Sequence, residues 1–221
     1  DDDIPLNAGC LKPLNLIIPK RSMINPEYPA AVIAGNVETS QYIVDALLGA
    51  LGVVAASQGT MNNFICGNER VHNYETICGG PGPSINHEGC SADHTHMTTS
   101  NVTDPEVLEW RFPVRLESFS IRKNSGGKGL KNGGDGVDRR IRFLEPMTVN
   151  IITGHRIVPP YGLAGGNSGA VGKNYVIHSN NNITELKTKG QIEVVKDDIF
   201  VLKTPGGGGF GKSTLAQQSK P

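Results

Sequence analysis

Apolar residues recur at helical spacing in one stretch of the first half of the chain. Intervals of three and four residues place five of them on one face of a helix: Ile43, Val44, Leu47, Leu48 and Leu51. Thr39 or Ser40 stands near the start of this stretch, where a helix cap is expected. The pattern predicts one long helix over residues 37–51, packed through its apolar face.

Shorter apolar or alternating runs predict strands, which concentrate in the second half. Residues 112–122 alternate between apolar and polar side chains, with a slip at Glu117-Ser118 that fits a bulge. Other predicted strands cover residues 14–19, 64–66, 74–78, 137–144, 147–153, 174–178, 192–195 and 199–202. Residues 104–110 are interpreted as a short turn. The expected fold class is therefore α+β, with a mostly β second half.

The same patterns divide the chain into three parts. Residues 1–110 form a helix-containing α+β part, which carries polar motifs suited to a site. Residues 111–211 form a β-rich part with glycine-rich turns, and six glycines stand between residues 125 and 136 alone. Residues 212–221 are polar and are expected to form a frayed tail.

Composition and charge narrow the classes of function. The chain has 21 Lys and Arg residues against 21 Asp and Glu residues, which argues against a nucleic-acid-binding or polybasic membrane-surface protein. No stretch reaches the roughly 18 apolar residues of a membrane span, so no membrane partner is expected. Glycine accounts for 28 of 221 residues, well above its usual share, and favours glycine turns between short strands.

The first residues and the cysteines indicate what kind of protein the chain comes from. The chain begins Asp1-Asp2-Asp3, with neither a methionine nor a secretory signal, so we expect it to be cut from a longer protein. Few, irregularly spaced cysteines suit reduced thiols in a cytoplasmic protein better than a disulfide framework. A buried apolar role is favoured over a nucleophilic one for three of them: Cys66, Cys78 and Cys90.

One glycine run matches a phosphate-binding loop letter for letter. Residues 206–213 satisfy G-x-x-x-x-G-K-[ST] and follow the predicted strand 199–202. A working loop opens onto a helix N-terminus inside a parallel sheet, yet only eight residues follow Ser213. We therefore interpret the run as a glycine turn that closes the last strand.

The segment 93–96 carries the sharpest candidate chemistry. On an extended segment His94 and His96 point to the same side, where they can share a metal ion or a proton path. Three further residues with ligand side chains lie near in sequence: Glu75, Glu88 and Cys90. A metal site needs a third or fourth ligand that the sequence does not identify, and histidines bonded to neighbouring backbone are the simpler alternative.

Two amide-rich patches offer donors to a carbonyl or a carboxylate. The first, residues 36–41, includes Glu38 and Gln41 at the mouth of the predicted helix, where the helix dipole favours an anion. The second, residues 57–63, includes Asn62 and Asn63. Capping explains part of the first patch, and a turn role and a site role are equally good accounts of both.

Eight short motifs follow one another along nearly the whole chain. They are Pro5-Leu-Asn-Ala-Gly-Cys10, Ala34-Gly-Asn-Val-Glu-Thr-Ser-Gln41, Ala56-Ser-Gln-Gly-Thr-Met-Asn-Asn63, Tyr74-Glu-Thr76, His94-Thr-His-Met-Thr98, Asn124-Ser-Gly-Gly127, Gly133-Gly-Asp-Gly136 and Thr204-Pro-Gly-Gly-Gly-Gly-Phe-Gly211. Together they resemble the C-terminal portion of the hydantoinase B/oxoprolinase family. The members that open 5-oxoproline are the most similar, through residues 55–59, 103–106 and 133–137.

The resemblance implies an ATP-dependent cyclic amide hydrolase that converts 5-oxoproline into glutamate, within glutathione metabolism. Relatives that cleave hydantoins or carboxylate ketones supply the alternative activities. ATP and a divalent metal are implied for the full-length enzyme, and the family's metal-binding Asp and His residues belong to a preceding portion. No metal residue or cofactor is therefore expected in this chain, which alone is expected to be inactive.

Partners and departures also follow from the resemblance. It implies the remaining hydantoinase B segment, a hydantoinase A-like half, further copies of the protein and a small cyclic amide substrate as partners. Thr99, Ser100 and Asn101 stand where the family commonly has Asn-Thr-Arg, so an arginine suited to a carboxylate or phosphate is missing. Asn73 replaces a usual tyrosine, and Asp93 adds a charge beside the histidines. These changes indicate an altered substrate rather than lost chemistry.

We expect a polar pocket that stabilises an oxyanion or positions a water molecule on an activated amide. The catalytic candidates are His94, His96 and, as a base, Glu75. The substrate-binding candidates are Glu38, Gln41, Asn62 and Asn63. The rival interpretation is a non-catalytic glycine-rich β domain that docks the catalytic halves and whose histidines are structural.

Overall fold

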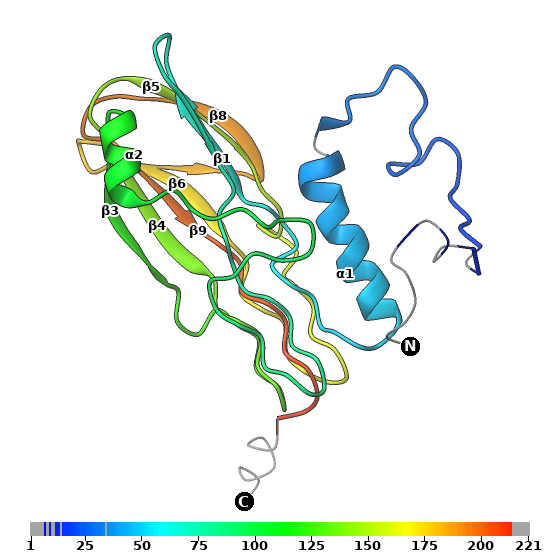
Figure 1. Cartoon of the computed structure of the whole chain (residues 1–221). Coiled ribbons are helices and arrows are strands. Elements are labelled where there is room, and N and C mark those ends of the chain that lie inside the picture. The colour runs from blue at the N-terminus through cyan, green and yellow to red at the C-terminus, as the bar shows by residue number, and fades with distance from the viewer. Residues whose placement is uncertain (1–6, 8, 10–11, 14, 34, 214–221) are drawn as a thin grey trace, which may run out of the picture.

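Two antiparallel sheets form the body of the molecule (Figure 1). The computed structural model describes residues 7, 9, 12–13, 15–33 and 35–213. The four-stranded sheet has the order β2-β1-β5-β8, with bounds His72–Glu75, Asn63–Gly67, Met147–Ile152 and Lys189–Val194. The five-stranded sheet has the order β3-β4-β9-β6-β7, with bounds Val114–Ile121, Val137–Phe143, Ile199–Lys203, Lys173–Ile177 and Ile183–Leu186.

Two helices accompany the sheets. A π-helical turn, Gly35–Thr39, leads into α1, Ser40–Ala50, which lies beside the sheets (Figure 1). The second helix, α2, spans Pro105–Arg111. The expected long helix and the α+β class with a mostly β second half are therefore confirmed. Among the described residues, neither helix combines the length and the apolarity that crossing a bilayer requires.

Apolar side chains from both sheets meet in one core. Every second residue of β4 is fully buried, as expected for a strand with one face toward a core. Phe64 of β1 stacks on Phe200 of β9 with ring centroids 5.0 Å apart, a favourable spacing for aromatic rings. Leu108 of α2 joins the same cluster. The two sheets therefore pack face to face.

The face of α1 that packs on the body is polar. Gln41 and Asp45 are buried, as is Glu38 in the preceding turn, while Ile43 and Leu47 remain 48% and 59% exposed. The predicted packing of the apolar face is therefore wrong. The loops beneath the helix supply hydrogen-bond partners, and buried polar groups require such partners, so the polar face takes the buried side.

Local predictions need correction at three places. Residues 104–110 do not form a turn, because Asp104 caps α2 through the amide of Glu106 at 2.9 Å and a proline begins the helix. Residues 15–19 form no strand, and residue 14 lies outside the described residues. The strand expected over residues 74–78 is displaced toward the N-terminus, since β2 ends at Glu75.

The remaining strands agree with the sequence patterns except for one. The predicted slip in residues 112–122 is confirmed as a register shift between Leu116 and Ser118. β7 has no predicted counterpart, because it is an edge strand whose residues are mostly exposed and show no apolar alternation. Residues 214–221, most of the expected frayed tail, lie outside the described residues.

The four-stranded sheet joins the two parts that the sequence suggested. β1 and β2 come before residue 110, whereas β5 and β8 come after it. β1 pairs with β5 over its whole length, from Asn63 opposite Ile152 to Gly67 opposite Thr148. A boundary between residues 110 and 111 would therefore divide one sheet between the two parts.

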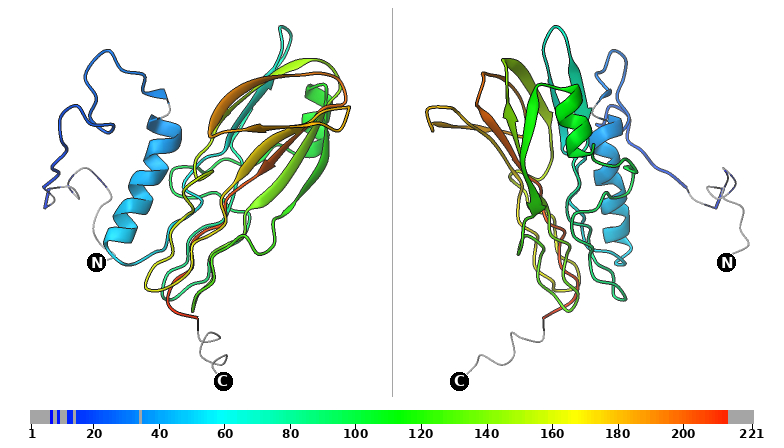
Figure 2. Two further views of the ribbon diagram at one scale, coloured as in Figure 1. Left: turned by 180° about the vertical axis from the view of Figure 1, so that it is seen from behind. Right: turned by 60° about the vertical axis from the view of Figure 1, so that its left-hand side comes forward.

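Glycine-rich segments from distant parts of the chain pack backbone against backbone at the end of the molecule opposite α2 (Figures 1 and 2). We call this the glycine bundle; its segments are residues 79–82, 126–134, 162–169 and 206–209. A side-chain carbon on Gly80 would overlap the carbonyl group of Gly134, and one on Gly208 would overlap that of Tyr161. Gly207 N donates to Gly134 O at 2.9 Å. Close backbone approach, more than turn geometry, accounts for these glycines.

We expect Gly208→Ala to destabilise the chain by roughly 3 kcal/mol or more, because the added methyl group forces the Tyr161 backbone away in a fully packed region. The measurement is the urea midpoint of unfolding. Gly190→Ala is the control, since its new methyl group would meet only Leu186 Cδ2 at an ordinary 3.5 Å. Equal midpoints for the two variants would contradict the close packing of the bundle.

Candidate functional site

Glu38 lies at the centre of a buried polar cluster between α1 and the loop before β1. Its Oε1 accepts hydrogen bonds from Thr60 Oγ1 at 2.9 Å, Met61 N at 3.1 Å and Asn63 Nδ2 at 2.7 Å. Its Oε2 is buried and has no hydrogen-bond partner among the described residues. Tyr74 donates to Asn63 Oδ1 at 2.7 Å and so orients the amide. One carboxylate oxygen is thus fixed and the other is left for a proton or a ligand.

The environment of Glu38 raises its pKa from 4.5 to about 7. Burial is the largest cause, since it penalises the charged carboxylate, and hydrogen bonds from Thr60 and Met61 oppose it. The positive charge of Arg156 opposes it as well. A carboxyl group with a pKa near 7 is present in both protonation states at neutral pH, which suits a general acid or base.

Arg156 supplies the cation of this cluster. Its Nη2 donates to Asn62 Oδ1 at 2.9 Å and to Asn174 Oδ1 at 2.8 Å, and its Nη1 donates to Gly154 O at 2.6 Å. Burial lowers the pKa of Arg156 from its ordinary value and Glu38 raises it, but a guanidinium stays charged at neutral pH. A rigidly held positive charge therefore lies beside a carboxyl group of shifted pKa.

Three cavities adjoin at Thr188, which lines each of them. Glu38 and Tyr42 line a cavity of about 270 Å³, and Tyr42 also lines a second of about 370 Å³ with His155 and Arg156. Arg156 continues into a third, of about 380 Å³. We call these three cavities the Thr188 groove. Glu38 lines one of these cavities, and Arg156 lines the other two.

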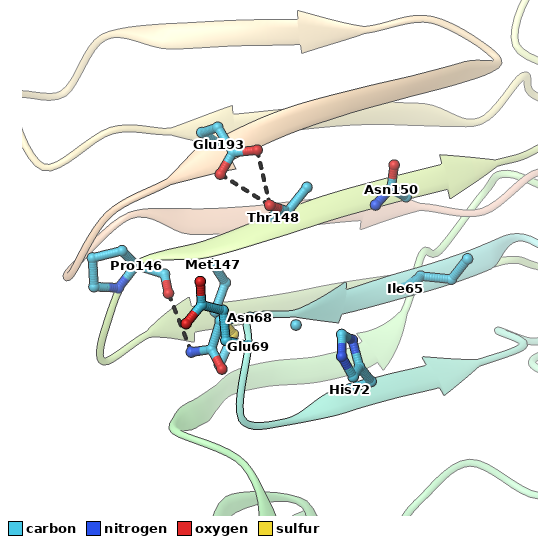
Figure 3. Close-up of a pocket in the computed structure, with 10 residues that line it drawn as sticks. Ile65, Asn68, Glu69, His72, Pro146, Met147, Thr148, Asn150 and Glu193 are labelled. Carbon is cyan, nitrogen blue, oxygen red and sulfur yellow. Dashed lines mark hydrogen bonds between the residues drawn. The ribbon is translucent and has the colours of Figure 1, made fainter.

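A larger cavity, of about 490 Å³, lies over the four-stranded sheet (Figure 3). Its wall includes His72 of β2 and Thr148 of β5, and Glu193 of β8 accepts from Thr148 Oγ1 at 2.8 Å and 3.0 Å. None of the residues that line it is a predicted site residue. Glu38 lines the Thr188 groove, so the candidate site is this groove and not the larger cavity.

A second polar cluster surrounds Asp45, on the same buried face of α1. The Asp45 carboxylate accepts from Ser57 N and Ser57 Oγ, both at 2.9 Å, and lies 2.8 Å from His96 Nε2. Gln41 Nε2 donates to Thr95 O at 3.1 Å. The serine and the histidine both bind the carboxylate, so this is an oriented Asp-His pair and not the Ser-His-Asp arrangement of acyl transfer.

The two predicted catalytic histidines have different surroundings. His96 sits in a turn with a φ of 53°, so the extended geometry that would place both rings on one side is absent. Both ring nitrogens of His94 are buried without a hydrogen-bond partner in the described part of the chain. Burial lowers the pKa of His94, with Asp93 opposing the shift, so its imidazole is neutral at neutral pH.

Glu75, the third predicted catalytic residue, lies apart from both clusters. It forms an ion pair with Arg139 at 2.8 Å, and both side chains are almost fully buried. Its other oxygen accepts from Thr103 N at 3.1 Å. A carboxylate held in this way links β2 to β4, which favours a structural role. The four predicted binding residues are divided. Glu38 lines the Thr188 groove, Asn63 and Asn62 are buried behind it in contact with Glu38 and Arg156, and Gln41 lies beside Asp45.

Four residues of these clusters have no counterpart in the sequence-based set: Tyr42, Asp45, His155 and Arg156. Asp45 is an acidic residue inside the predicted apolar helix, a signal that such a residue is buried for a reason. His155 and Arg156 follow the predicted strand 147–153 directly, where site residues are common. Tyr42 carries no signal of its own in the sequence.

The glycine run does not form a phosphate site, and the described ranges hold no cluster of metal ligands. In the glycine run, Gly207 N, Gly208 N and Gly209 N donate to Gly134 O, Ala56 O and Asn167 O at 2.8–2.9 Å. These amides are therefore not available to a phosphate. The predicted turn is not found either, because residues 204–209 contain no turn and continue from β9 between the other segments of the glycine bundle. Within the described ranges, no three His, Cys, Asp or Glu side chains converge as metal ligands would.

Comparison with known proteins places these clusters in context. The family model described as hydantoinase B/oxoprolinase matches residues 1–213. A 5-oxoprolinase from Dictyostelium discoideum is 44% identical over 210 residues, which cover 95% of this chain and 17% of that protein. An uncharacterised protein from Methanocaldococcus jannaschii is 40% identical, over 96% of this chain and 38% of its own length. The chain thus spans only a minor part of either relative.

A solved structure shares the fold. The ATP-dependent caprolactamase from Pseudomonas jessenii superposes with a TM-score of 0.63 at 20% identity, over 76% of this chain and 32% of that one. The similarity therefore extends to most of the two-sheet body.

We expect Glu38→Gln to remove a pH dependence of stability. Folding raises the pKa of Glu38 from 4.5 to about 7, so the folded state holds the proton more tightly. Its stabilising contribution is complete below pH 4.5 and is lost as the pH rises through 7. The stability of the variant relative to the wild type should therefore rise by about 3 kcal/mol over this interval. Urea unfolding at several pH values measures it, and a constant difference would contradict the shifted pKa.

Proposed function

We propose, because this chain belongs to the hydantoinase B/oxoprolinase family, that it is the C-terminal portion of a longer ATP-dependent enzyme that opens 5-oxoproline to glutamate. The name of the Dictyostelium relative and its 44% identity support this substrate. The ATP-dependent caprolactamase, which shares the fold, supports ATP use and the class of cyclic amides. The observation in this chain that carries the proposal is the buried carboxyl group of Glu38 with a pKa near 7.

Opening a cyclic amide adds the oxygen of water to the carbonyl carbon, breaks the C–N bond and gives a proton to the ring nitrogen. A group that is half protonated at neutral pH can accept the proton of water and return it to the nitrogen. We propose that Glu38 Oε2 is this group. Arg156, which lines the same groove and is held there by the oxygen of Asn62, is suited to hold the carboxylate of the substrate.

Glu38 Oε2 is covered by its neighbours in the present arrangement. Glu38 Oε2 and Tyr42 Oη both lie beside Gly154, which has no side chain that could keep them apart. Tyr42 is 38% exposed, so its ring can move without opening the core. We propose that the substrate displaces Tyr42 to reach the carboxyl group.

The Asp45 cluster is proposed as the second contributor. Asp45 fixes the ring of His96 through Nε2, at 2.8 Å. His94 lies two residues away and supplies a neutral imidazole. We propose that these histidines bind or orient the opened amide, whereas Glu75 stabilises the core through Arg139.

The cofactors and partners of the longer protein complete the proposal. ATP and a divalent metal are proposed to bind outside the described residues, because the glycine amides are engaged and no ligand trio converges there. The remaining hydantoinase B segment, a hydantoinase A-like half and further copies of the protein are the proposed partners. A cytoplasmic location is supported by Cys66, Cys78 and Cys90, which are free thiols.

In the longer enzyme, Glu38→Gln should lower kcat for 5-oxoproline by roughly 10²- to 10⁴-fold, because the amide keeps the shape of the carboxyl group and cannot transfer the proton. Coupled ADP release measures turnover, with hydantoin and a ketone as the alternative substrates. Glu106→Gln, at an exposed position on α2, is the matched control. Wild-type turnover by the Glu38 variant would reject the role of Glu38.

Replacing both His94 and His96 by alanine should lower turnover by at least about 10²-fold if they act on the amide. His72→Ala, on the exposed face of β2, serves as the control. The same ADP assay is used, with unfolding midpoints to confirm that each variant folds. Unchanged turnover in the double variant would restrict the histidines to a structural role.

A further inference from the structure

The outward face of α1 is apolar and uncovered. Ile43, Leu47 and Leu51 recur at helical spacing and are 48%, 59% and 65% exposed. The opposite face of α1 is engaged through Gln41 and Asp45, which hydrogen bond to the loops of the body. The helix cannot rotate to bury its apolar side without breaking these bonds, so the apolar face stays on the outside.

An arm of residues 15–33 runs outside α1, on the side away from the sheets (Figures 1 and 2). Its residues are nearly all exposed. The large apolar side chains among them are Leu16, Ile17, Ile18, Met23, Ile24, Tyr28, Val32 and Ile33. Tyr28 is 98% exposed and Ile17 84%, so the arm covers neither the helix nor itself.

Charge contributes little to this surface. Arg21 and Glu27 are paired with each other at 3.0 Å within the arm. The outward side of α1 has no charged residue of its own, since Asp45 points into the body. Contiguous apolar patches of this kind are rare on free soluble proteins and mark contact surfaces.

We propose that the outward face of α1 and the arm, together the docking surface, are covered by the rest of the hydantoinase B portion of the protein. This inference rests on the proposed function only in assuming a longer protein. A body seated there would contact the helix on one side and the arm on the other. It would also fix α1, which carries Asp45, and the π-helical turn before it, which carries Glu38.

The lengths of the relatives favour this occupant over others. The region occupies 17% of the Dictyostelium protein but 38% of the Methanocaldococcus protein, whose chain is therefore less than half as long. Each of them is 40% or more identical to this chain over the matched region. In the shorter relative, less chain remains outside this region. We assign that remaining part to the hydantoinase B portion. A hydantoinase A-like half, by contrast, need not lie within the shorter chain, and the crosslinking test below distinguishes a second copy.

The first test is thiol labelling of the longer protein that carries this region. We expect the thiol of Leu47→Cys to react with a maleimide at least about tenfold more slowly than that of Trp110→Cys, because it must wait for the interface to open. Trp110 is 83% exposed on α2, away from the docking surface, and is the matched control. In the present chain alone both thiols should react rapidly. Equal rates in the longer protein would overturn the proposal.

The second test identifies the occupant. A photoreactive benzophenone side chain replaces Leu47 or Ile33 in the longer protein, and the crosslinked peptide is sequenced by mass spectrometry. A partner peptide from the remaining hydantoinase B portion supports the proposal, whereas one from the A-like half or a second copy of this region overturns it. Neither readout uses turnover. The docking surface can therefore be tested even in a longer protein that does not open 5-oxoproline. The two proposals can fail independently of each other.

Discussion

Close backbone contact in the glycine bundle is the constraint from which the rest of the structure follows. Gly80 N donates to Pro205 O, and Gly208 N donates to Ala56 O, so segments far apart in sequence are joined without side chains between them. The loop that carries Ser57 and Asn62 is one of those held in this way. Because these loops present amides and hydroxyls, the helix packed on them must offer its polar face. The exposed apolar face of α1 is the consequence on the other side.

Burying the polar face beside α1 costs free energy, and stability alone does not require such groups to be buried. Glu38 has one carboxylate oxygen with no partner among the described residues, and leaving a buried polar atom unsatisfied costs free energy. In the part of the chain that the structure describes, Arg156 is bound by neutral oxygens, from Asn62, Gly154 and Asn174. Two opposite and incompletely matched charges at adjoining cavities are more typical of a binding or catalytic site than of a core. Stability and function thus meet at the same few residues.

Sequence patterns predicted the elements better than their orientation. The helix near residues 37–51 and most strands are confirmed because periodicity reports which residues share a face. Periodicity does not report which face is covered, so the α1 prediction had the helix right and its packing reversed. The predicted turn at residues 104–110 was wrong because Asp104 caps α2. Motif resemblance identified the family, since ordered motifs such as residues 34–41 and 56–63 span the chain.

The candidate site was only partly accessible from sequence, for a physical reason. Glu38 was predicted from the patch at the helix mouth, and Asn62 and Asn63 were predicted from the second amide-rich patch. The three residues meet at one cluster. Arg156 joins them from a position 94 residues after Asn62, through a contact that no local pattern encodes. Glu75 was drawn from a motif in which it stands beside other polar residues, yet β2 aims it at Arg139 in the core. Long-range packing decides which polar residues share a site.

The central claim is that the reaction takes place between the polar face of α1 and the loops held by the glycine bundle. A structure of the longer enzyme with 5-oxoproline bound tests this most directly. The account predicts the lactam in the Thr188 groove, with its ring within hydrogen-bond distance of Glu38, its carboxylate at Arg156 and Tyr42 displaced. A lactam bound elsewhere, with Glu38 still covered by Tyr42 and Gly154, would contradict it.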